Sequence, residues 1–133
     1  MMINSAELTF ISRSVNERFA RMSVAAFATQ LDPTVEELAE IKTAVSEAVT
    51  NCIVHAYGSD LGTIKMKMQL FDSNVLRITV RDFGRGIDDV EKAMEPCFST
   101  GAIMESFSDR LRVSSKPGKG TKVVMERKIV KRG

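Results

Sequence analysis

The chain of 133 residues carries 19 lysines and arginines against 17 aspartates and glutamates, and this near-neutral balance gives no electrostatic footprint of direct nucleic acid binding. With 44% hydrophobic residues, its length and composition are those of one globular domain with a sizeable core. The two cysteines cannot build a disulfide framework, no apolar run approaches the roughly 20 residues of a membrane span, and the N-terminus lacks a signal-peptide pattern. These features predict a soluble cytoplasmic protein without a membrane segment.

A short strand and a helix are predicted at the start of the chain. Residues 7–11 alternate around Leu8 and Phe10, which indicates a strand. A helix from Ser14 to Gln30 follows, and Ser14 with Glu17 is predicted to form its capping box. Its apolar residues fall on two nearly opposite sides: Val15, Phe19, Met22 and Ala26 on one, and Ala20, Val24 and Phe27 on the other. Such a helix either lies between two layers or presents one side to another chain, and the Ala20 side is the candidate partner surface.

The longest predicted helix runs from Thr34 to Gly58, with a capping box between Thr34 and Glu37. Its expected buried face repeats at helical spacing and consists of Leu38, Ile41, Val45, Ala48, Cys52 and Ala56. Glu47 and Asn51, four residues apart, share a stripe on the flank of this face. A merely solvated flank is the plain alternative for this stripe. The single histidine, His55, continues the stripe but has no partners for a zinc site.

Two alternating strands are predicted next, at residues 63–71 and 75–82, joined by a turn of Asp72, Ser73 and Asn74. Counting by two from Leu76 places the carboxylate of Asp82 on the apolar side of the second strand. A buried carboxylate is costly unless a donor binds it, so Asp82 needs a hydrogen-bond donor.

The rest of the chain is predicted to hold two helical pieces and two strands. Residues 90–94 and 103–111 read as helical, and strands at 111–115 and 121–130 are joined by a proline- and glycine-rich turn. Thr121 shares the parity of Val123 and Met125. The glycines of the run Asp82-Phe83-Gly84-Arg85-Gly86-Ile87 allow backbone to approach a ligand closely, although such a run alone is a weak signal.

Three motifs stand in a fixed order: E-x-x-x-N on the long helix, D-x-G-x-G after a strand, and G-x-G-T opening a late strand. Jointly they resemble the ATPase and kinase superfamily that includes gyrase, the Hsp90 chaperone, histidine kinases and the mismatch-repair ATPases. Within it, the runs VAAFATQLDPT, EIKTAVSEAVTN and VRDFGRGI are similar to the serine-kinase anti-sigma factors of spore-forming bacteria, over almost the whole chain. The resemblance implies a single domain at residues 1–133 with the Bergerat-type ATP-binding fold. This fold is a two-layer α/β (α+β) sandwich of a mixed sheet with helices on one face.

The same resemblance implies a role for each motif residue. Asn51 would hold Mg²⁺ against the phosphates of ATP or ADP, and Asp82 would accept from the adenine amino group. Glu47 would be the catalytic base or a water-positioning group. Other nucleotide-binding positions are Gly84, Gly86, Ile87, Thr100, Gly101 and Thr121. The partners implied are a sporulation sigma factor, an anti-anti-sigma protein whose serine is phosphorylated, and a second copy in a homodimer. Arg21, on the first helix, is the expected partner contact.

One departure from the family concerns the lid, the mobile segment that ends in a further glycine box and cradles the phosphates. Here Thr100 is followed directly by Gly101, so the lid is missing between them. The missing lid has three possible origins: natural loss, engineered excision, or omission of residues from the sequence. Natural loss is the least favoured of the three. Two other functions stay open: a sigma-sequestering module with a structural nucleotide, and a chaperone-type ATPase.

Overall fold

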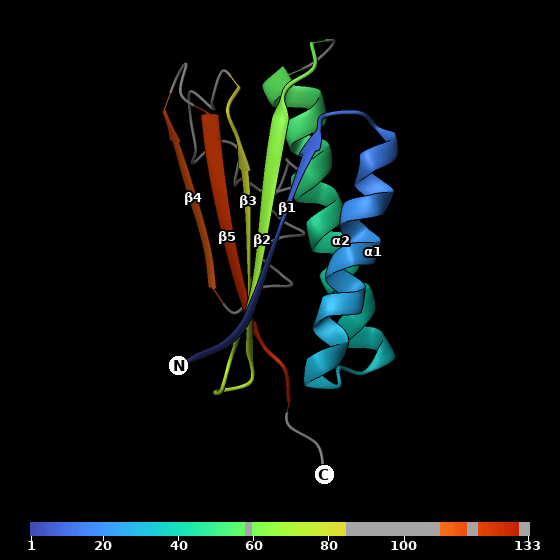
Figure 1. Ribbon diagram of the computed structural model, residues 1–133, viewed down its shortest axis with the longest axis vertical. Helices are drawn as coiled ribbons and strands as arrows, with labels where there is room; N and C mark the ends of the chain where they lie inside the picture. The colour runs from blue at the N-terminus through green and yellow to red at the C-terminus, as the bar shows by residue number, and fades with distance from the viewer. Residues whose placement is uncertain (58–59, 85–109, 117–119, 131–133) are drawn as a thin grey trace.

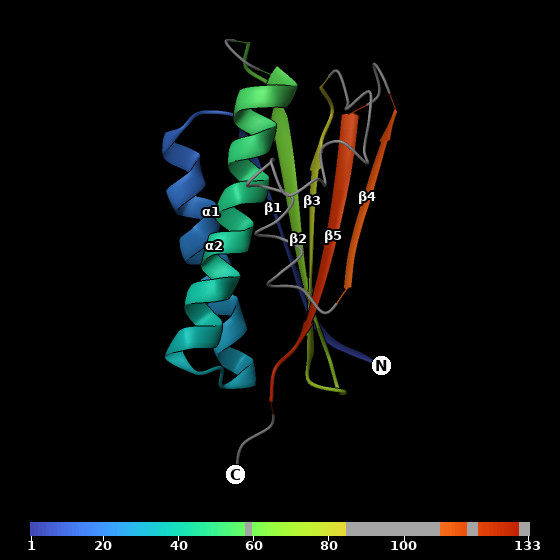
Figure 2. The same cartoon turned by 180° about the vertical axis from the view of Figure 1, so that it is seen from behind.

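The computed structural model describes residues 1–57, 60–84, 110–116 and 120–130. The described residues form a five-stranded sheet with two α-helices on one face (Figures 1 and 2). In chain order the elements are β1 (Met2–Ile11), α1 (Val15–Ala28), a 3-10 helix (Thr29–Leu31), α2 (Val35–Asn51), a π-helical segment (Cys52–Tyr57), β2 (Thr63–Phe71), β3 (Val75–Asp82), β4 (Arg110–Lys116) and β5 (Gly120–Lys128). The predicted two-layer α/β class is confirmed.

The strand order is β1-β2-β3-β5-β4, and every described pair is antiparallel. The prediction of a mixed sheet is therefore wrong, because the described sheet is antiparallel throughout. Two helices, an even number, separate β1 from β2, so the chain returns to the end of the sheet at which β1 stopped. Ile11 pairs with Thr63 there, and the Ser12 amide donates to the Gly62 carbonyl at 2.9 Å. An antiparallel β1–β2 pair is the only one that this path permits.

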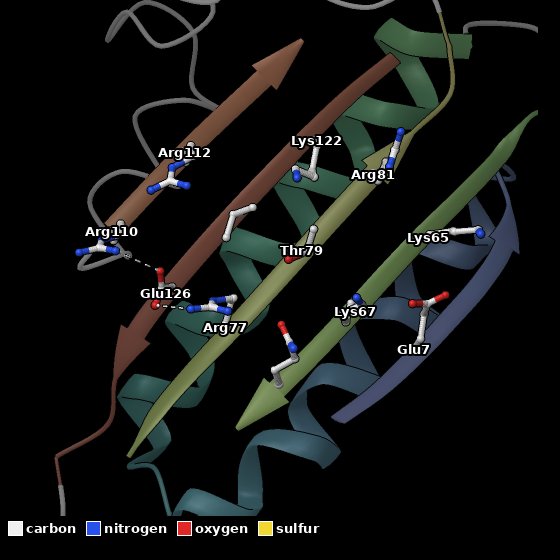
Figure 3. Close-up of a pocket in the computed structure, with 12 residues that line it drawn as sticks. Glu7, Lys65, Lys67, Arg77, Thr79, Arg81, Arg110, Arg112, Lys122 and Glu126 are labelled. Atoms are coloured by element: carbon white, nitrogen blue, oxygen red, sulfur yellow. Dashed lines mark ion pairs between the residues drawn. The ribbon is translucent and has the colours of Figure 1, made fainter. Parts of the chain in front are cut away.

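Strands β2 and β3 have the predicted bounds and faces. Their inward residues are buried: Ile64, Met66, Met68, Leu70, Leu76, Ile78 and Val80. Their outward residues are mainly charged or polar and lie on the face away from the helices, the outer face (Figure 3). Strand β1 is longer than predicted because its first residues pair with the end of β2, and Arg110 and Leu111 belong to β4 instead of a helix because they pair with β5. The other predicted helical residues, 90–94 and 103–109, lie outside the described residues.

Helix α1 corrects two predictions. Ser14 makes no side-chain capping bond, because its backbone is itself helical, with φ −58° and ψ −32°. The Glu17 carboxylate, the other half of the predicted box, instead accepts from the Ser46 hydroxyl of α2 and lies 3.6 Å from Arg21. Ala20 and Val24 are fully buried, so the predicted partner side faces the core. The opposite stripe is the exposed one, at 73% for Val15, 50% for Phe19 and 58% for Met22. Small side chains at Ala20, Val24 and Ala28 suit the side that packs closely on α2.

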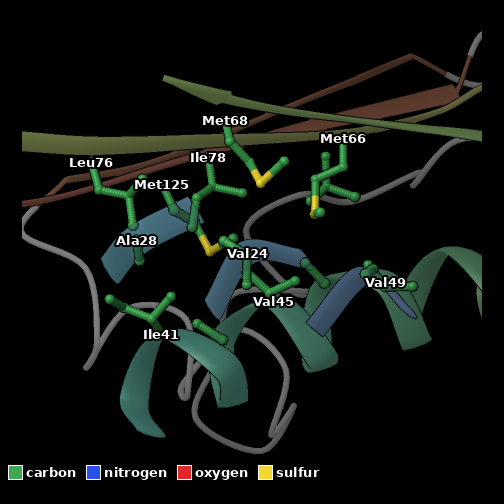
Figure 4. Packing of buried hydrophobic residues seen from close by; sticks show 14 of the residues in the cluster. Val24, Ala28, Ile41, Val45, Val49, Met66, Met68, Leu76, Ile78 and Met125 are labelled. Carbon is green, nitrogen blue, oxygen red and sulfur yellow. The ribbon is translucent and has the colours of Figure 1, made fainter. Parts of the chain in front are cut away.

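Helix α2 begins with the predicted capping box. The Thr34 amide donates to Glu37 Oε1 at 2.8 Å, and the Glu37 amide donates to Thr34 Oγ1 at 3.0 Å. Ile41, Val45 and Ala48 are buried as expected, and Figure 4 shows α2 facing the apolar side of the sheet. The α-helix ends at Asn51, earlier than predicted, because the chain continues as the π-helical segment Cys52–Tyr57. No helix among the described residues is both long and apolar enough to cross a membrane.

Candidate functional site

Asp82 is the last residue of β3 and points into the helix-covered side of the sheet, where it is only 3% exposed. Its Oδ1 accepts from the Gly84 amide at 3.0 Å and from the Thr121 amide of β5 at 3.2 Å. These two amides are the donors that its inward position requires. A carboxylate has about four acceptor positions, so capacity for further donors remains.

Gly120, the first residue of β5, brings this strand against the end of β3. Its φ is +89°, and a Cβ built on it would lie 2.2 Å from the Asp82 carbonyl oxygen and 2.8 Å from the Phe83 Cα. Only glycine fits such an approach without strain. The contact places the buried Thr121 beside Asp82, with the Thr121 hydroxyl 2.9 Å from the Ser115 hydroxyl of β4.

Cys52 is a buried thiol beside Asp82, and the sequence reasoning counted it only as a core residue. Burial raises the pKa of the Cys52 thiol well above its ordinary value, and the Asp82 carboxylate raises this pKa further by its charge and by a hydrogen bond. The group is therefore a neutral thiol that donates to Asp82, not a reactive thiolate. In the sequence, only the position of Cys52 directly after Asn51 indicated that it would lie near the site.

Tyr57, at the end of the π-helical segment, holds the turn that follows Asp82. Its hydroxyl donates to the Thr63 carbonyl and accepts from the Phe83 amide, both at 2.7 Å. Gly62 leaves room for the ring, because a Cβ there would lie 2.1 Å from it. The tyrosine links the π-helical segment to the start of β2 and to the residue that follows β3, and no sequence motif indicated this role.

Glu47 and Asn51 lie one turn apart near the end of α2, and both are half-buried. Asn51 directly precedes Cys52, so the end of this helix lies beside the end of β3 (Figures 1 and 2). A π-helical segment follows Asn51, and such segments are frequent at functional sites. The structure thus gathers Asn51, Asp82, Gly84 and Thr121 at one end of the molecule, with Glu47 one turn behind.

Several predicted site residues do not belong to this group. Gly86, Ile87, Thr100 and Gly101, and with them the missing lid, lie outside the described residues. Arg21 lies on α1 in a separate cluster with Glu17 and Ser46. His55 is exposed.

A protein-built metal cage is absent from the described parts of the chain, which hold no group of three or more His, Cys, Asp or Glu side chains able to bind a metal. The side-chain oxygens near the end of α2 suit a different kind of metal site, one that binds Mg²⁺ together with phosphate. Mg²⁺ keeps several waters and needs one or two protein oxygens beside phosphate. The amide oxygen of the half-buried Asn51 is of that type.

The sequence matches the histidine kinase-like ATPase domain family over residues 12–127. A relative described as anti-sigma F factor, from Caldanaerobacter subterraneus subsp. tengcongensis, is 54% identical over 136 positions, which cover 95% of this chain and 94% of the relative. Anti-sigma F factors of Geobacillus kaustophilus and Clostridium acetobutylicum are 46% and 44% identical and cover 98% and 97% of this chain and 96% of each relative.

Two solved structures share the fold. The first, of RsbU and RsbW domains from Mycobacterium tuberculosis, has a TM-score of 0.73 at 20% identity and covers 96% of this chain, which spans only 32% of that longer one. The second, the histidine kinase domain of a blue-light activated kinase from Erythrobacter litoralis, has a TM-score of 0.61 at 22% identity and covers 82% of this chain and 59% of that one.

Proposed function

Because the chain belongs to the anti-sigma F factor family of histidine kinase-like ATPase domains, we propose that it binds ATP or ADP, holds a sigma factor inactive and phosphorylates a serine of an anti-anti-sigma protein. The family membership supports the sigma factor as partner and the nucleotide as ligand. The serine-kinase activity, the anti-anti-sigma substrate and the homodimer are the further steps of the proposal.

Asp82 is the observation that carries the nucleotide site. A carboxylate that is buried at the end of a strand, with two backbone amides on one oxygen, is fixed in orientation. An adenine ring presents an amino donor on one edge, and such a fixed acceptor recognises that edge. Gly84 and Thr121 flank it at their observed positions, and Gly86, Ile87, Thr100 and Gly101 are proposed to complete the nucleotide contacts.

Glu47 and Asn51 are proposed to act on the phosphate side. Glu47 takes the proton of the attacking serine hydroxyl, whose oxygen forms a bond to the γ-phosphorus while the bond to ADP breaks. The Asn51 amide oxygen holds Mg²⁺, which supplies neutralising charge to the phosphates. The one-turn spacing of the two side chains on α2 supports a shared role.

Asp82→Asn tests the nucleotide site. The asparagine oxygen can still accept from the Gly84 and Thr121 amides, but its amide nitrogen then faces the adenine amino group, donor against donor. We expect ADP affinity to fall by about 10- to 150-fold, which corresponds to the loss of about 1.5 to 3 kcal/mol for a hydrogen bond to a charged group. Isothermal titration calorimetry measures the ADP affinity of the variant and of the wild type.

Asp72→Asn is the matched control, since this exposed carboxylate pairs with the N-terminal amine and lies in the β2–β3 turn, at the opposite end of β3 from Asp82. Its ADP affinity should equal that of the wild type. A folded Asp82→Asn protein that binds ADP as tightly as the Asp72→Asn protein would refute the proposed nucleotide site.

A sigma-sequestering protein with weak phosphate transfer is a second candidate. The alignment to the Caldanaerobacter relative spans 136 positions but holds 95% of the 133 residues, so about ten of its positions have no residue of this chain. A missing lid would remove backbone amides that neutralise phosphate charge, and this would slow transfer more than it weakens adenine binding. ATP-dependent labelling of the anti-anti-sigma protein separates the kinase from the sequestering protein, and release of free phosphate without an acceptor would instead identify a chaperone-type ATPase.

Arg21 is the proposed partner contact on α1. Its side chain is 37% exposed and lies 3.6 Å from Glu17, which also accepts from Ser46 of α2. We expect Arg21→Ala to weaken sigma factor binding by about 10-fold or more, because interface arginines often act as anchors, while ADP affinity stays unchanged. Surface plasmon resonance with purified sigma factor measures this, and Arg18→Ala on an exposed position of the same helix is the control. Equal binding by both variants and the wild type would exclude Arg21 from the interface.

A further inference from the structure

The outer face of the sheet is strongly basic. No described helix or strand covers this face, which forms a shallow hollow of about 540 Å³ (Figure 3). Seven lysine and arginine side chains line the hollow, against two glutamates. The chain as a whole carries a net charge of only +2, so positive charge is concentrated on this face.

Three of these cations form a row across neighbouring strands. Lys65 of β2 pairs directly with Arg81 of β3, and Arg81 pairs directly with Lys122 of β5. We call these three residues the cation row. Like charges at directly opposite positions destabilise a sheet, so the row opposes folding. All three side chains are exposed.

A neighbouring set of arginines on the same face is neutralised, in contrast to the row. Glu126 lies between Arg77 and Arg110 and pairs with them at 3.5 and 3.8 Å. No carboxylate among the described residues forms an ion pair with Lys65, Arg81 or Lys122. A solvated sheet face explains scattered charges, but not an unneutralised line of three that lowers stability.

We propose that the cation row docks an acidic polypeptide segment of a protein partner. Adjacent strands lie about 4.8 Å apart, and alternate side chains of an extended chain repeat at about 6.8 Å. An extended segment crossing the strands can therefore place its carboxylates within reach of three long cationic side chains. Arginine and lysine both bind carboxylates well, and arginine does so through two parallel hydrogen bonds.

Two features favour a polypeptide over a nucleic acid. Glu7 and Glu126 lie on the same face and would repel a continuous phosphate backbone, whereas a peptide with spaced acidic residues can avoid them. Sequence-tolerant binding of single strands also needs aromatic stacking platforms. The nearest ring, Phe83, already has Arg81 over it at 5.0 Å and Lys65 at 5.9 Å from its centroid. The surface goes beyond the nucleotide function, since Asp82 points to the opposite side of the sheet.

The test uses a fluorescent oligo-glutamate peptide as the probe, at low salt, with the full chain. Lys65→Glu/Lys122→Glu reverses both ends of the row without touching a proposed nucleotide residue. Arg13→Glu/Arg18→Glu makes the same change in net charge at exposed positions on the helical side of the molecule. Fluorescence anisotropy reports binding, ADP titration confirms that the folded nucleotide site persists, and thermal unfolding reports stability.

We expect the wild type and the Arg13/Arg18 variant to bind the peptide, and the Lys65/Lys122 variant to lose at least about 10-fold in affinity. The Lys65/Lys122 variant should also unfold at a higher temperature than the wild type, because charges opposite Arg81 become attractive. Equal losses in both variants would show a net-charge effect and overturn the proposal. Tighter binding of a single-stranded oligothymidylate of equal charge would assign the surface to nucleic acid and overturn the proposal. Absence of binding to the peptide would overturn the proposal as well.

Discussion

Glu47→Ala is expected to lower the rate of phosphate transfer to the anti-anti-sigma protein by about 10²- to 10⁴-fold, the usual contribution of a positioned base. ADP affinity should change little, because the proposed adenine contact is Asp82, on β3, whereas Glu47 lies on α2. Transfer from labelled ATP in a single turnover measures the chemical step, and calorimetry measures binding.

Asn51→Ala should act differently from Glu47→Ala. It removes the amide oxygen proposed to bind Mg²⁺, so ADP binding should lose its dependence on Mg²⁺. Glu36→Ala is the matched control, since Glu36 is an exposed carboxylate in the first turn of the same helix. If the Glu47 and Asn51 variants transfer phosphate as fast as the Glu36 variant, neither residue has the proposed role.

Gly120→Ala is expected to lower the free energy of unfolding by about 2 to 5 kcal/mol, from backbone strain and steric overlap together. The added methyl group would lie 2.2 Å from the Asp82 carbonyl oxygen, which is backbone and cannot rotate away. The φ of +89° is also costly for alanine. Relief of the clash requires β5 to move away from the end of β3.

The displacement of β5 should also weaken ADP binding, because β5 carries the Thr121 amide that orients Asp82. Urea unfolding measures the stability, and calorimetry at a temperature where the variant remains folded measures ADP affinity. Ser114→Ala, at an exposed position of the neighbouring strand, is the control and should match the wild type in both. An alanine variant at position 120 with wild-type stability would mean that β5 does not approach β3 as closely as observed.

Much of the site was predictable because its signals are local. The parity of β3 placed Asp82 on the buried side, and the structure confirms this burial. The spacing of Glu47 and Asn51 placed them on one flank of α2, and the structure finds both half-buried there. Their chemical roles stay predictions, since resemblance rather than geometry assigns them. The surroundings of Asp82 were not predictable, because Thr121 is 39 residues away in the chain.

The sequence by itself determined the elements whose rules act over a few residues. Strict alternation and a polar turn delimited β2 and β3, and a reciprocal pair of side chains marked the start of α2. Each of these signals is complete within one element or one turn, so distant parts of the chain cannot change it.

Only the tertiary structure decided which side of α1 is buried, how the strands pair and what surrounds Asp82. Both sides of α1 are apolar, so burial depended on which side fits closely against α2, and the side with Ala20 and Val24 does. Strand direction depended on the path of two helices between β1 and β2. The contacts of Cys52 with Asp82 and of Tyr57 with Phe83 join residues about 25 to 30 positions apart, and packing free energy, which is a property of the whole fold, selects them.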